Sequence, residues 1–342
     1  MIKVGVVGYG YWGPNLVRNF VESSETCVLG VSDLNSSRLG LAHTRYPYIR
    51  TTTDAFDLIR DPAIDAIAIC TPVNSHFELA MAALQAGKHV LVEKPLADSS
   101  DRALRLTEEA SRRRLVLMVD HTFVYTGAVR KIRELVQSNA LGEIYYYDSV
   151  RVNLGLFQHD VDVMWDLAVH DLSIMQSVLK ESPLAVSATG MAHVTGKAQD
   201  VAFMTLFFGS RLIAHLHVNW LSPVKVRKTL IGASRKMIVY DDLENSDKIK
   251  VYDKGITLTN TEASLHNILV SYRTGDMCSP KIDNTEALLV EILHFADCIR
   301  QNRIPLTGGV AGIEVVQILE AASRSALERG NPIDVPPVAA AL

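Results

Sequence analysis

The chain has few cysteines, no excess of positive charge and no long hydrophobic run, and each absence excludes a class of protein. Its four cysteines form no CxxC pair, which excludes a disulfide framework and a paired-cysteine zinc site and predicts reduced thiols. Lysine and arginine number 34 against 38 aspartates and glutamates, so the net charge is −4 and no nucleic-acid partner is expected. No apolar run approaches the ~18 residues of a membrane span, and no secretory leader is recognisable. We therefore expect a soluble, cytoplasmic protein without a membrane partner.

Short apolar runs that alternate with amphipathic stretches dominate the first third of the chain. The composition, 48% hydrophobic and 21% charged, is that of a folded globular protein, and 342 residues suffice for about two domains. The runs have strand length and are apolar on both faces, as buried parallel strands are. They are Lys3–Val7, Val28–Val31, Ala66–Cys70, His89–Val92 and Leu115–Val119. Helical patterns between them, such as Ser99–Arg113, predict an α/β Rossmann dinucleotide-binding domain over residues 1–122.

The pattern changes in residues 123–342, which we predict to form an α+β domain for substrate binding and oligomerisation. Strands with period-two alternation indicate a mostly antiparallel open sheet. Phe203–Phe208 and Arg211–Trp220 predict a hairpin with a tight turn at Gly209-Ser210, with glycine at its first central position. One long helix, Met164–Leu179, interrupts the strands. Two helices close the chain, and we expect that they can pack back on the first domain.

A glycine-rich turn follows the first predicted strand. Gly8-Tyr9-Gly10-Tyr11-Trp12-Gly13 has the form GxGxxG between a strand and a helix. The first glycine permits the tight turn, the second lets a pyrophosphate approach the backbone, and the third lets the helix pack on the strand. The unpaired N–H groups at the helix start then bind phosphate. These six residues therefore predict a dinucleotide site, against the alternative of a turn without a ligand.

An acidic residue at the end of the second strand is the expected partner of this turn. Asp33 stands 20 residues after Gly13, where a carboxylate accepts hydrogen bonds from the ribose hydroxyls of NAD and repels a 2′-phosphate. Arg38 lies just beyond and is able to bind such a phosphate. NAD is therefore the predicted cofactor, and NADP stays open. The alternative for Asp33 is a helix-capping role.

Lys94 follows the predicted strand His89–Val92 in the sequence Glu93-Lys94-Pro95. Ligands of an open α/β sheet bind beyond the carboxyl ends of its strands, so Lys94 is expected at the nicotinamide end of the cofactor. An ammonium group there is able to stabilise a developing alkoxide. Position alone leaves open the alternative of a lysine that only reaches solvent from a strand end.

Four motifs in this order resemble the Gfo/Idh/MocA oxidoreductases, over nearly the whole chain. They are Gly8–Gly13, Cys70–His76, Glu93–Pro95 and Trp165–Asp171, the last being similar to the family's D-x-x-x-H catalytic helix. Residues 121–127 depart from the Asn-Pro or Arg-Phe pattern of many members. Residues 151–158 resemble members near sugar-nucleotide biosynthesis, which favours the sugar-nucleotide dehydrogenase-like branch.

The resemblance implies an NAD(P)-dependent dehydrogenase or reductase that acts on a secondary alcohol or ketone of a sugar, sugar nucleotide or polyol. It implies that the Lys94–Pro95 peptide is cis and that Lys94, Asp166 and His170 form the catalytic group. It further implies cofactor contacts by the loop residues Thr71, Pro72, Asn74, His76, Glu93 and Lys94.

Asp166 and His170 are four residues apart and therefore share one face of a helix. An aspartate beside a histidine orients the ring and stabilises the imidazolium, which makes His170 the expected base for the hydroxyl proton. Asp166 would orient His170 or relay the proton. Without the resemblance, such a pair is more often a surface ion pair. No dedicated metal motif such as HExxH is present, so no metal is expected.

The substrate is expected between Lys94 and the segment that leads to His170. Four polar residues are candidate substrate contacts: Arg151, Asn153, Gln158 and Arg227. The family resemblance implies that the free sheet face of the second domain pairs subunits into a homodimer or homotetramer. Two rival functions stay open: a non-catalytic dinucleotide-binding regulator, and a reductase of an imine or tetrapyrrole.

Overall fold

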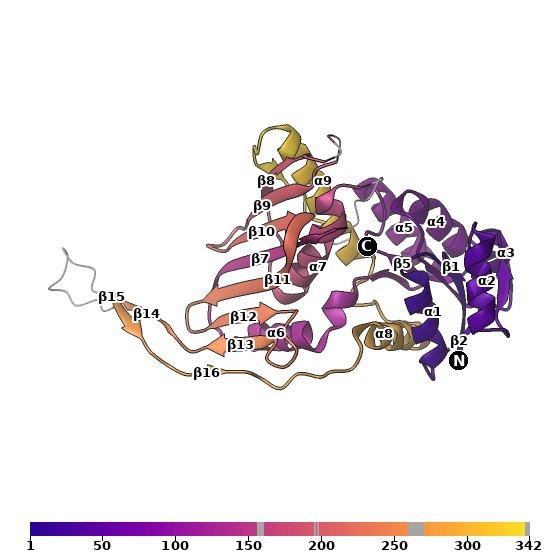
Figure 1. The fold of residues 1–342 in the computed structure, drawn as a ribbon, viewed down its shortest axis with the longest axis horizontal. Helices are drawn as coiled ribbons and strands as arrows, with labels where there is room; N and C mark the ends of the chain where they lie inside the picture. Colours follow the sequence, from indigo (N-terminus) through magenta and orange to yellow (C-terminus); the bar gives the residue numbers. More distant parts are fainter. Residues whose placement is uncertain (156–160, 195, 197, 259–269, 339–342) are drawn as a thin grey trace. The chain divides into compact units, whose positions relative to one another are not determined.

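The structure is a computed structural model, and it describes residues 1–155, 161–194, 196, 198–258 and 270–338. The chain forms two compact units, each assembled from separate segments (Figure 1). The first unit consists mainly of Met1–Thr126 and Thr285–Glu320, and the second of Gly127–Asn284 and Ala321–Val335.

A six-stranded parallel sheet forms the centre of the first unit, in the order β3-β2-β1-β4-β5-β6. Its strands are β1 (Ile2–Val7), β2 (Thr26–Ser32), β3 (Arg50–Thr52), β4 (Ala66–Ile69), β5 (His89–Glu93) and β6 (Leu117–Asp120). The strand order changes direction between β1 and β4, which is the switch point where such sheets bind ligands. The predicted Rossmann sheet is confirmed. The short edge strand β3 has no apolar run and was not predicted.

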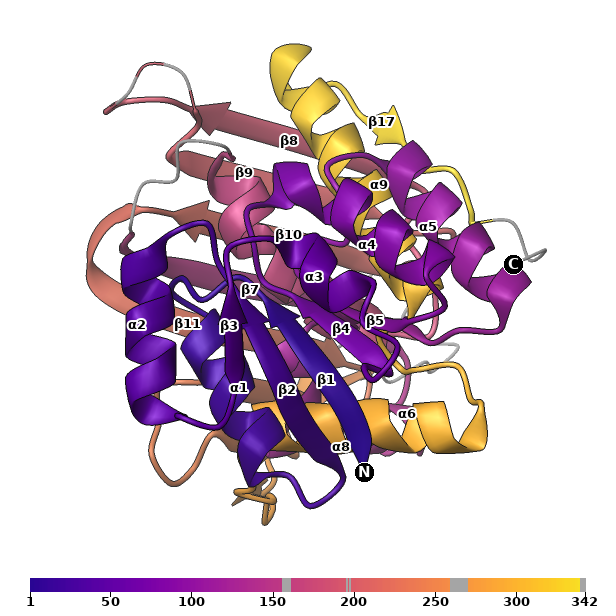
Figure 2. The same ribbon diagram turned by 90° about the vertical axis from the view of Figure 1, so that its right-hand side faces the viewer.

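Helices cover both faces of this sheet (Figure 2). They are α1 (Gly13–Glu22), α2 (Ser36–Arg45), α3 (Ala55–Ile59), α4 (His76–Gln85), α5 (Ser100–Arg113), α8 (Ala287–Gln301) and the first part of α9 (Gly309–Leu327), with the 3₁₀ turns η1 (Val73–Ser75) and η2 (Thr122–Tyr125). Neighbouring residues of one strand enter different cores: Ala68 joins the core of α1 and α8, and Ile69 joins that of α4 and α5. Burial on both faces explains why the strands read as continuous apolar runs.

A nine-stranded sheet forms the second unit, in the order β16-β13-β12-β11-β7-β10-β9-β8-β17. Its strands are β7 (Ile144–Leu154), β8 (Ala185–Met191), β9 (Val201–Phe207), β10 (Ile213–Asn219), β11 (Leu221–Ala233), β12 (Met237–Asp241), β13 (Ile249–Tyr252), β16 (Met277–Cys278) and β17 (Ile333–Asp334). Only β7 and β10 pair in parallel within this sheet, so the predicted mostly antiparallel sheet is confirmed. A separate two-stranded sheet joins β14 (Gly255–Leu258) and β15 (Val270–Arg273).

The helical segments of the second unit are α6, η3, α7 and the end of α9. Their bounds are Gly127–Gln137 for α6, Met164–Ala168 for the π-helical turn η3 and Val169–Val178 for α7. The predicted helix over Met164–Leu179 is therefore confirmed, but its first turn is π-helical rather than α-helical. Such π turns are rare in proteins, and those that do occur are frequently found at functional sites.

The hairpin of β9 and β10 differs from the prediction in its turn. Phe207 lies opposite Ile213, so residues 208–212 form the connection. Gly209 does not have a positive φ, and the tight turn predicted with glycine at its first central position is therefore wrong. The hydroxyl of Ser210 instead accepts the N–H of Leu212 at 3.1 Å, which stabilises a wider loop.

Candidate functional site

The glycine turn after β1 has the geometry that a dinucleotide requires. Gly8 has a φ of +98°, and a Cβ added to it would lie 2.6 Å from the carbonyl oxygen of Cys70. A Cβ on Gly13 would lie 2.3 Å from the carbonyl oxygen of Gly8. A Cβ on Gly10 would meet nothing closer than the Arg38 guanidinium at 3.6 Å. The turn is therefore closed where β1 and α1 pack together and open at Gly10, where a pyrophosphate would approach.

Asp33 lies beside this turn at the end of β2. Its Oδ2 accepts the N–H of Tyr9 at 2.7 Å, and its Oδ1 accepts the N–H of Asn35 at 2.8 Å. A carboxylate oxygen has two lone pairs, so Oδ1 retains acceptor capacity for a ribose hydroxyl. Arg38 Nη1 lies 3.5 Å from Oδ2. The side-chain cap of α2 is Asn35, which accepts the N–H of Ser37 at 2.9 Å.

The remaining side chains of the turn have different surroundings. The Tyr9 ring is buried in the core, whereas Tyr11 is 87% exposed. The indole N–H of Trp12 donates to Asp120 Oδ2 at 2.7 Å, and the Thr122 hydroxyl donates to the other oxygen of Asp120. Asp120 therefore ties the glycine turn to the end of β6. Asp120 was not among the predicted site residues, although its place at the carboxyl end of a strand is a usable signal.

His76 joins two of the loops that were predicted to line the cofactor. Its ring nitrogens lie 2.9 Å from the carbonyl oxygen of Pro95 and 2.8 Å from that of Thr71. Burial lowers the pKa of His76. The Lys94–Pro95 peptide is cis, as the resemblance implies. The ring of His76 thus connects the loop after β4 to the loop after β5, and its nitrogens are occupied by backbone.

The other residues of these loops are arranged around the same edge of the sheet. The hydroxyls of Thr71 and Ser75 are 2.7 Å apart, and Ser75 donates to the carbonyl oxygen of Pro72 at 2.8 Å. Pro72 and Asn74 are exposed, and Glu93 and Lys94 are half-buried.

His121 follows β6 and is 1% exposed. Burial, with a smaller contribution from the charge of Lys94, lowers the pKa of His121 to about 3. Glu93 and Asp120 are paired in register on β5 and β6, so Lys94 and His121 leave adjacent strand ends. His121 is therefore a neutral imidazole close to a predicted catalytic lysine.

Asp166 and His170 are positioned in the second unit by the turn η3 and the start of α7. Asp162 caps this turn, because its Oδ1 accepts the N–H groups of Met164 and Trp165 at 2.9 and 3.1 Å. The indole N–H of Trp220 donates to Asp166 Oδ2 at 3.0 Å. Asp166 and His170 are both half-buried. The bond between Trp220 and Asp166 was not predicted, because it joins residues 54 positions apart in the sequence.

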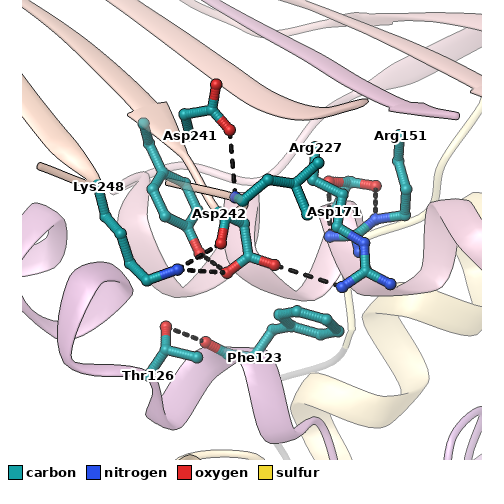
Figure 3. A network of polar contacts seen from close by, with 10 residues as sticks. Phe123, Thr126, Arg151, Asp171, Arg227, Asp241, Asp242 and Lys248 are labelled. Carbon is teal, nitrogen blue, oxygen red and sulfur yellow. Dashed lines mark hydrogen bonds and ion pairs between the residues drawn. The ribbon is translucent and has the colours of Figure 1, made fainter. Parts of the chain in front are cut away.

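A buried ion pair joins Arg151 to Asp171, the residue that follows His170 in the sequence (Figure 3). Arg151 Nε donates to Asp171 Oδ2 at 2.6 Å, and Arg151 Nη2 donates to Oδ1 at 3.2 Å. The Ser149 hydroxyl donates to the same Oδ1 at 2.9 Å. Both side chains of the pair are 4% exposed. Arg151, predicted as a substrate contact, thus uses two of its N–H groups to fix the first turn of α7.

The other predicted substrate contacts differ in their surroundings. Arg227 lies 3.3 Å from Asp242 and keeps 27% of its side chain exposed. The Tyr240 hydroxyl donates to Asp242 at 3.0 Å, and Lys248 lies on the same carboxylate (Figure 3). Asn153 is half-buried on β7. Gln158 lies outside the described residues.

The predicted catalytic group draws on both units, with Lys94 in the first and Asp166 and His170 in the second. Over the part of the chain that the structure describes, no cluster of three His, Cys, Asp or Glu side chains is arranged to hold a metal ion. A search of the same residues finds no helix with the length and apolarity to cross a membrane.

Comparison with known proteins assigns the family. The model of an oxidoreductase family with an NAD-binding Rossmann fold matches residues 2–121, and that of the GFO/IDH/MocA C-terminal domain matches residues 129–239. The chain therefore belongs to the Gfo/Idh/MocA oxidoreductases, and its first unit contains an NAD-binding Rossmann fold.

Relatives with named activities cover almost the whole chain. UDP-N-acetylglucosamine 3-dehydrogenase of Acidithiobacillus ferrooxidans is 28% identical over 319 residues, which is 92% of this chain and 94% of the relative. Myo-inositol 2-dehydrogenase of Thermotoga maritima is 23% identical over 354 residues, 97% of this chain and 98% of the relative. The predicted class, an NAD(P)-dependent dehydrogenase acting on a sugar or polyol CH–OH group, is confirmed.

Solved structures give the same assignment of the fold. The structure of the UDP-N-acetylglucosamine 3-dehydrogenase from Acidithiobacillus ferrooxidans has a TM-score of 0.77 at 27% identity, over 95% of this chain and 96% of that one. Levoglucosan dehydrogenase in complex with NADH has a TM-score of 0.83 at 19% identity, over 98% and 100% of the two chains.

Proposed function

We propose that the protein interconverts a secondary alcohol and a ketone on a nucleotide-linked sugar, with NAD as the redox partner. The observation that carries the proposal is the pair Asp166 and His170, a carboxylate and an imidazole on one short helical segment with the carboxylate fixed by Trp220. An oriented imidazole of this kind is a general base for a hydroxyl proton.

The residues of the first unit fit the cofactor. The backbone of Gly8–Gly13 would hold the pyrophosphate, because Gly10 leaves the approach open, and Asp33 would accept the ribose hydroxyls. When bound, NAD supplies the acceptor for the hydride that leaves the alcohol carbon.

The chain's own residues then handle the proton and the charge. His170 takes the hydroxyl proton, Asp166 orients its ring, and Lys94 donates a hydrogen bond to the oxygen as negative charge develops there. In the direction of reduction, His170 returns the proton to the same oxygen.

Two features support a nucleotide-linked sugar over a simple polyol. The relative with the higher identity of the two above is named for UDP-N-acetylglucosamine. Arg227, with 27% of its side chain exposed, is the better placed of the two predicted arginines to meet an anionic group, because Arg151 is 4% exposed. Guanidinium groups bind phosphate oxygens in a bidentate manner.

The test is turnover by the purified protein with NAD, followed by the absorbance of NADH, on UDP-N-acetylglucosamine and on myo-inositol. We expect turnover of the nucleotide sugar, and a loss of roughly 10²–10⁴-fold in Lys94→Ala and His170→Ala, with NAD still bound by both variants. Full activity in both variants would refute the assigned roles. Activity on myo-inositol alone would refute the substrate class.

We further propose that the protein forms a homo-oligomer through the exposed face of the nine-stranded sheet. This face presents apolar side chains from neighbouring strands, among them Phe203 at 42% and Ile213 at 45% exposure. Phe203 stacks on His217 with ring centroids 4.4 Å apart. A second copy would remove this apolar surface from water. We expect light scattering to show monomers for Phe203→Asp. The control Leu34→Asp, at an exposed residue of the first unit, should remain oligomeric. A monomeric wild type would refute the proposal.

A further inference from the structure

The indole N–H of Trp220 donates a hydrogen bond to the predicted catalytic carboxylate of Asp166. It lies 3.0 Å from Asp166 Oδ2, although the two residues are 54 positions apart in the chain. Trp220 is 0% exposed. A donor that is fully withdrawn from water does not exchange its partner for solvent, so the bond holds the carboxylate in one orientation.

The backbone and ring of Trp220 are fixed on several sides. Its N–H donates to the carbonyl oxygen of Asp200 at 2.9 Å, and its carbonyl oxygen accepts the N–H of Gly155 at 3.0 Å. A Cβ on Gly155 would lie 2.3 Å from Cδ1 of the indole, so glycine is needed for the ring to occupy this place. The indole therefore has a single position.

The same short loop also fixes the turn that bears Asp166. The backbone carbonyl oxygen of Gln199 accepts the N–H of Val163, immediately before η3, at 2.9 Å. The backbone carbonyl oxygen of the next residue, Asp200, accepts the N–H of Trp220. Asp200 is itself 0% exposed, and its carboxylate accepts the N–H groups of His193 and Val194 at 2.7 and 2.8 Å. Residues 199–200 thus set the position of Trp220 relative to Asp166.

We propose that Trp220 is a positioning residue for the reaction. Its bond to Oδ2 fixes the Asp166 carboxylate one helical turn before His170, and in the proposed reaction this carboxylate orients the imidazole toward the substrate hydroxyl. This inference rests on the proposed function, because the orientation of Asp166 matters for turnover only if His170 is the base.

The chain provides a matched control for the test. Trp165 precedes Asp166 in the same turn, and its indole N–H donates to the hydroxyl of Ser323 at 3.0 Å. Trp220→Phe and Trp165→Phe each remove one indole hydrogen bond, but only the first removes a bond to the predicted catalytic carboxylate. We expect Trp220→Phe to lower kcat on UDP-N-acetylglucosamine roughly tenfold with NAD affinity unchanged, and Trp165→Phe to lower kcat less.

A double-mutant cycle separates this effect from a loss of packing. If Trp220 acts through Asp166, then Trp220→Phe lowers kcat no further in the Asp166→Asn background. Equal losses of kcat in the wild-type and Asp166→Asn backgrounds, or equal kcat in Trp220→Phe and Trp165→Phe, would overturn the inference. Replacing Trp220 by 3-benzothienylalanine keeps the ring shape without the N–H, and the same fall in kcat is expected if the phenylalanine variant does not fold.

The proposed function and this inference fail in different ways. Full turnover in Asp166→Asn refutes the catalytic role of Asp166. If the wild type turns over neither sugar, the proposed function fails, and the hydrogen bond is then judged by NMR. The Trp220 indole N–H resonance must move in Asp166→Asn while that of Trp165 does not, and an unmoved Trp220 resonance overturns the inference.

Discussion

Replacing Arg151 by methionine tests whether this arginine serves the fold or the substrate. The variant keeps an unbranched apolar stem, ends before the guanidinium, and so removes the partner of Asp171 from a site where both side chains are 4% exposed. Asp171 would retain the Ser149 hydroxyl at 2.9 Å and lose the bonds at 2.6 and 3.2 Å. A buried carboxylate without its counter-ion is strongly unfavourable.

We expect the free energy of unfolding of the second unit to fall by about 3–5 kcal/mol. For a unit of this size, the midpoint of thermal unfolding should fall by roughly 6–20 °C. Two of the three tryptophans, Trp165 and Trp220, lie in this unit, so tryptophan fluorescence follows mainly its unfolding. The double variant Arg151→Met/Asp171→Leu should recover most of the loss, because it removes the unpaired charge.

Arg112→Met is the control, because it breaks an exposed ion pair with Glu109 and should leave the midpoint unchanged. The reasoning would be refuted if Arg151→Met unfolded at the same temperature as this control. If it did so and also raised KM for the sugar, Arg151 would be a substrate contact rather than an anchor of α7.

Three further predictions concern the first unit. Asp33→Gly should weaken the binding of NAD at least tenfold and improve the binding of NADP, because the carboxylate that repels a 2′-phosphate is lost beside Arg38. Steady-state kinetics with both cofactors measure the preference, and an unchanged preference contradicts the assignment. Gly13→Ala should destabilise the fold by about 1–3 kcal/mol, because its Cβ would lie 2.3 Å from a carbonyl oxygen. Gly10→Ala should preserve the melting temperature and weaken the binding of NAD, which calorimetry measures. Equal melting temperatures for both variants would contradict the geometry. The folded-state pKa of His121 is lowered from 6.5 to about 3, so the unfolded chain binds a proton there first, and stability is lost as pH falls through this range. His121→Phe should therefore move the acid-unfolding midpoint, followed by circular dichroism, to lower pH, and a midpoint that stays in place would show that His121 does not contribute.

The parallel sheet was readable from the sequence because its strands are buried on both faces. Ala68 and Ile69 are neighbours in one strand and pack into different cores, so the strand has no solvent-facing side and no alternating polar residues. The edge strand β3, with the sequence Arg-Thr-Thr, is part of the same sheet and has no such pattern. Its place depends on pairing with β2, which local composition does not encode.

The site was predictable where a motif is contiguous and not where a contact joins distant segments. The glycine turn and the spacing of Asp166 and His170 are local patterns. The bonds from Trp12 to Asp120 and from Trp220 to Asp166 span 108 and 54 positions. The π turn at Met164–Ala168 also has no sequence signature, because it depends on the cap by Asp162 and the anchor at Gln199.

The helix α8 has a consequence for the order in which the protein matures. Its residues Leu288, Ile292 and Phe295 share one core with Val4 and Leu16 of the first strand and helix. On the ribosome, the part of this core that α8 covers therefore stays exposed until nearly three hundred residues have been synthesised. The nascent chain carries an apolar surface for most of its synthesis, which is the type of surface that molecular chaperones bind.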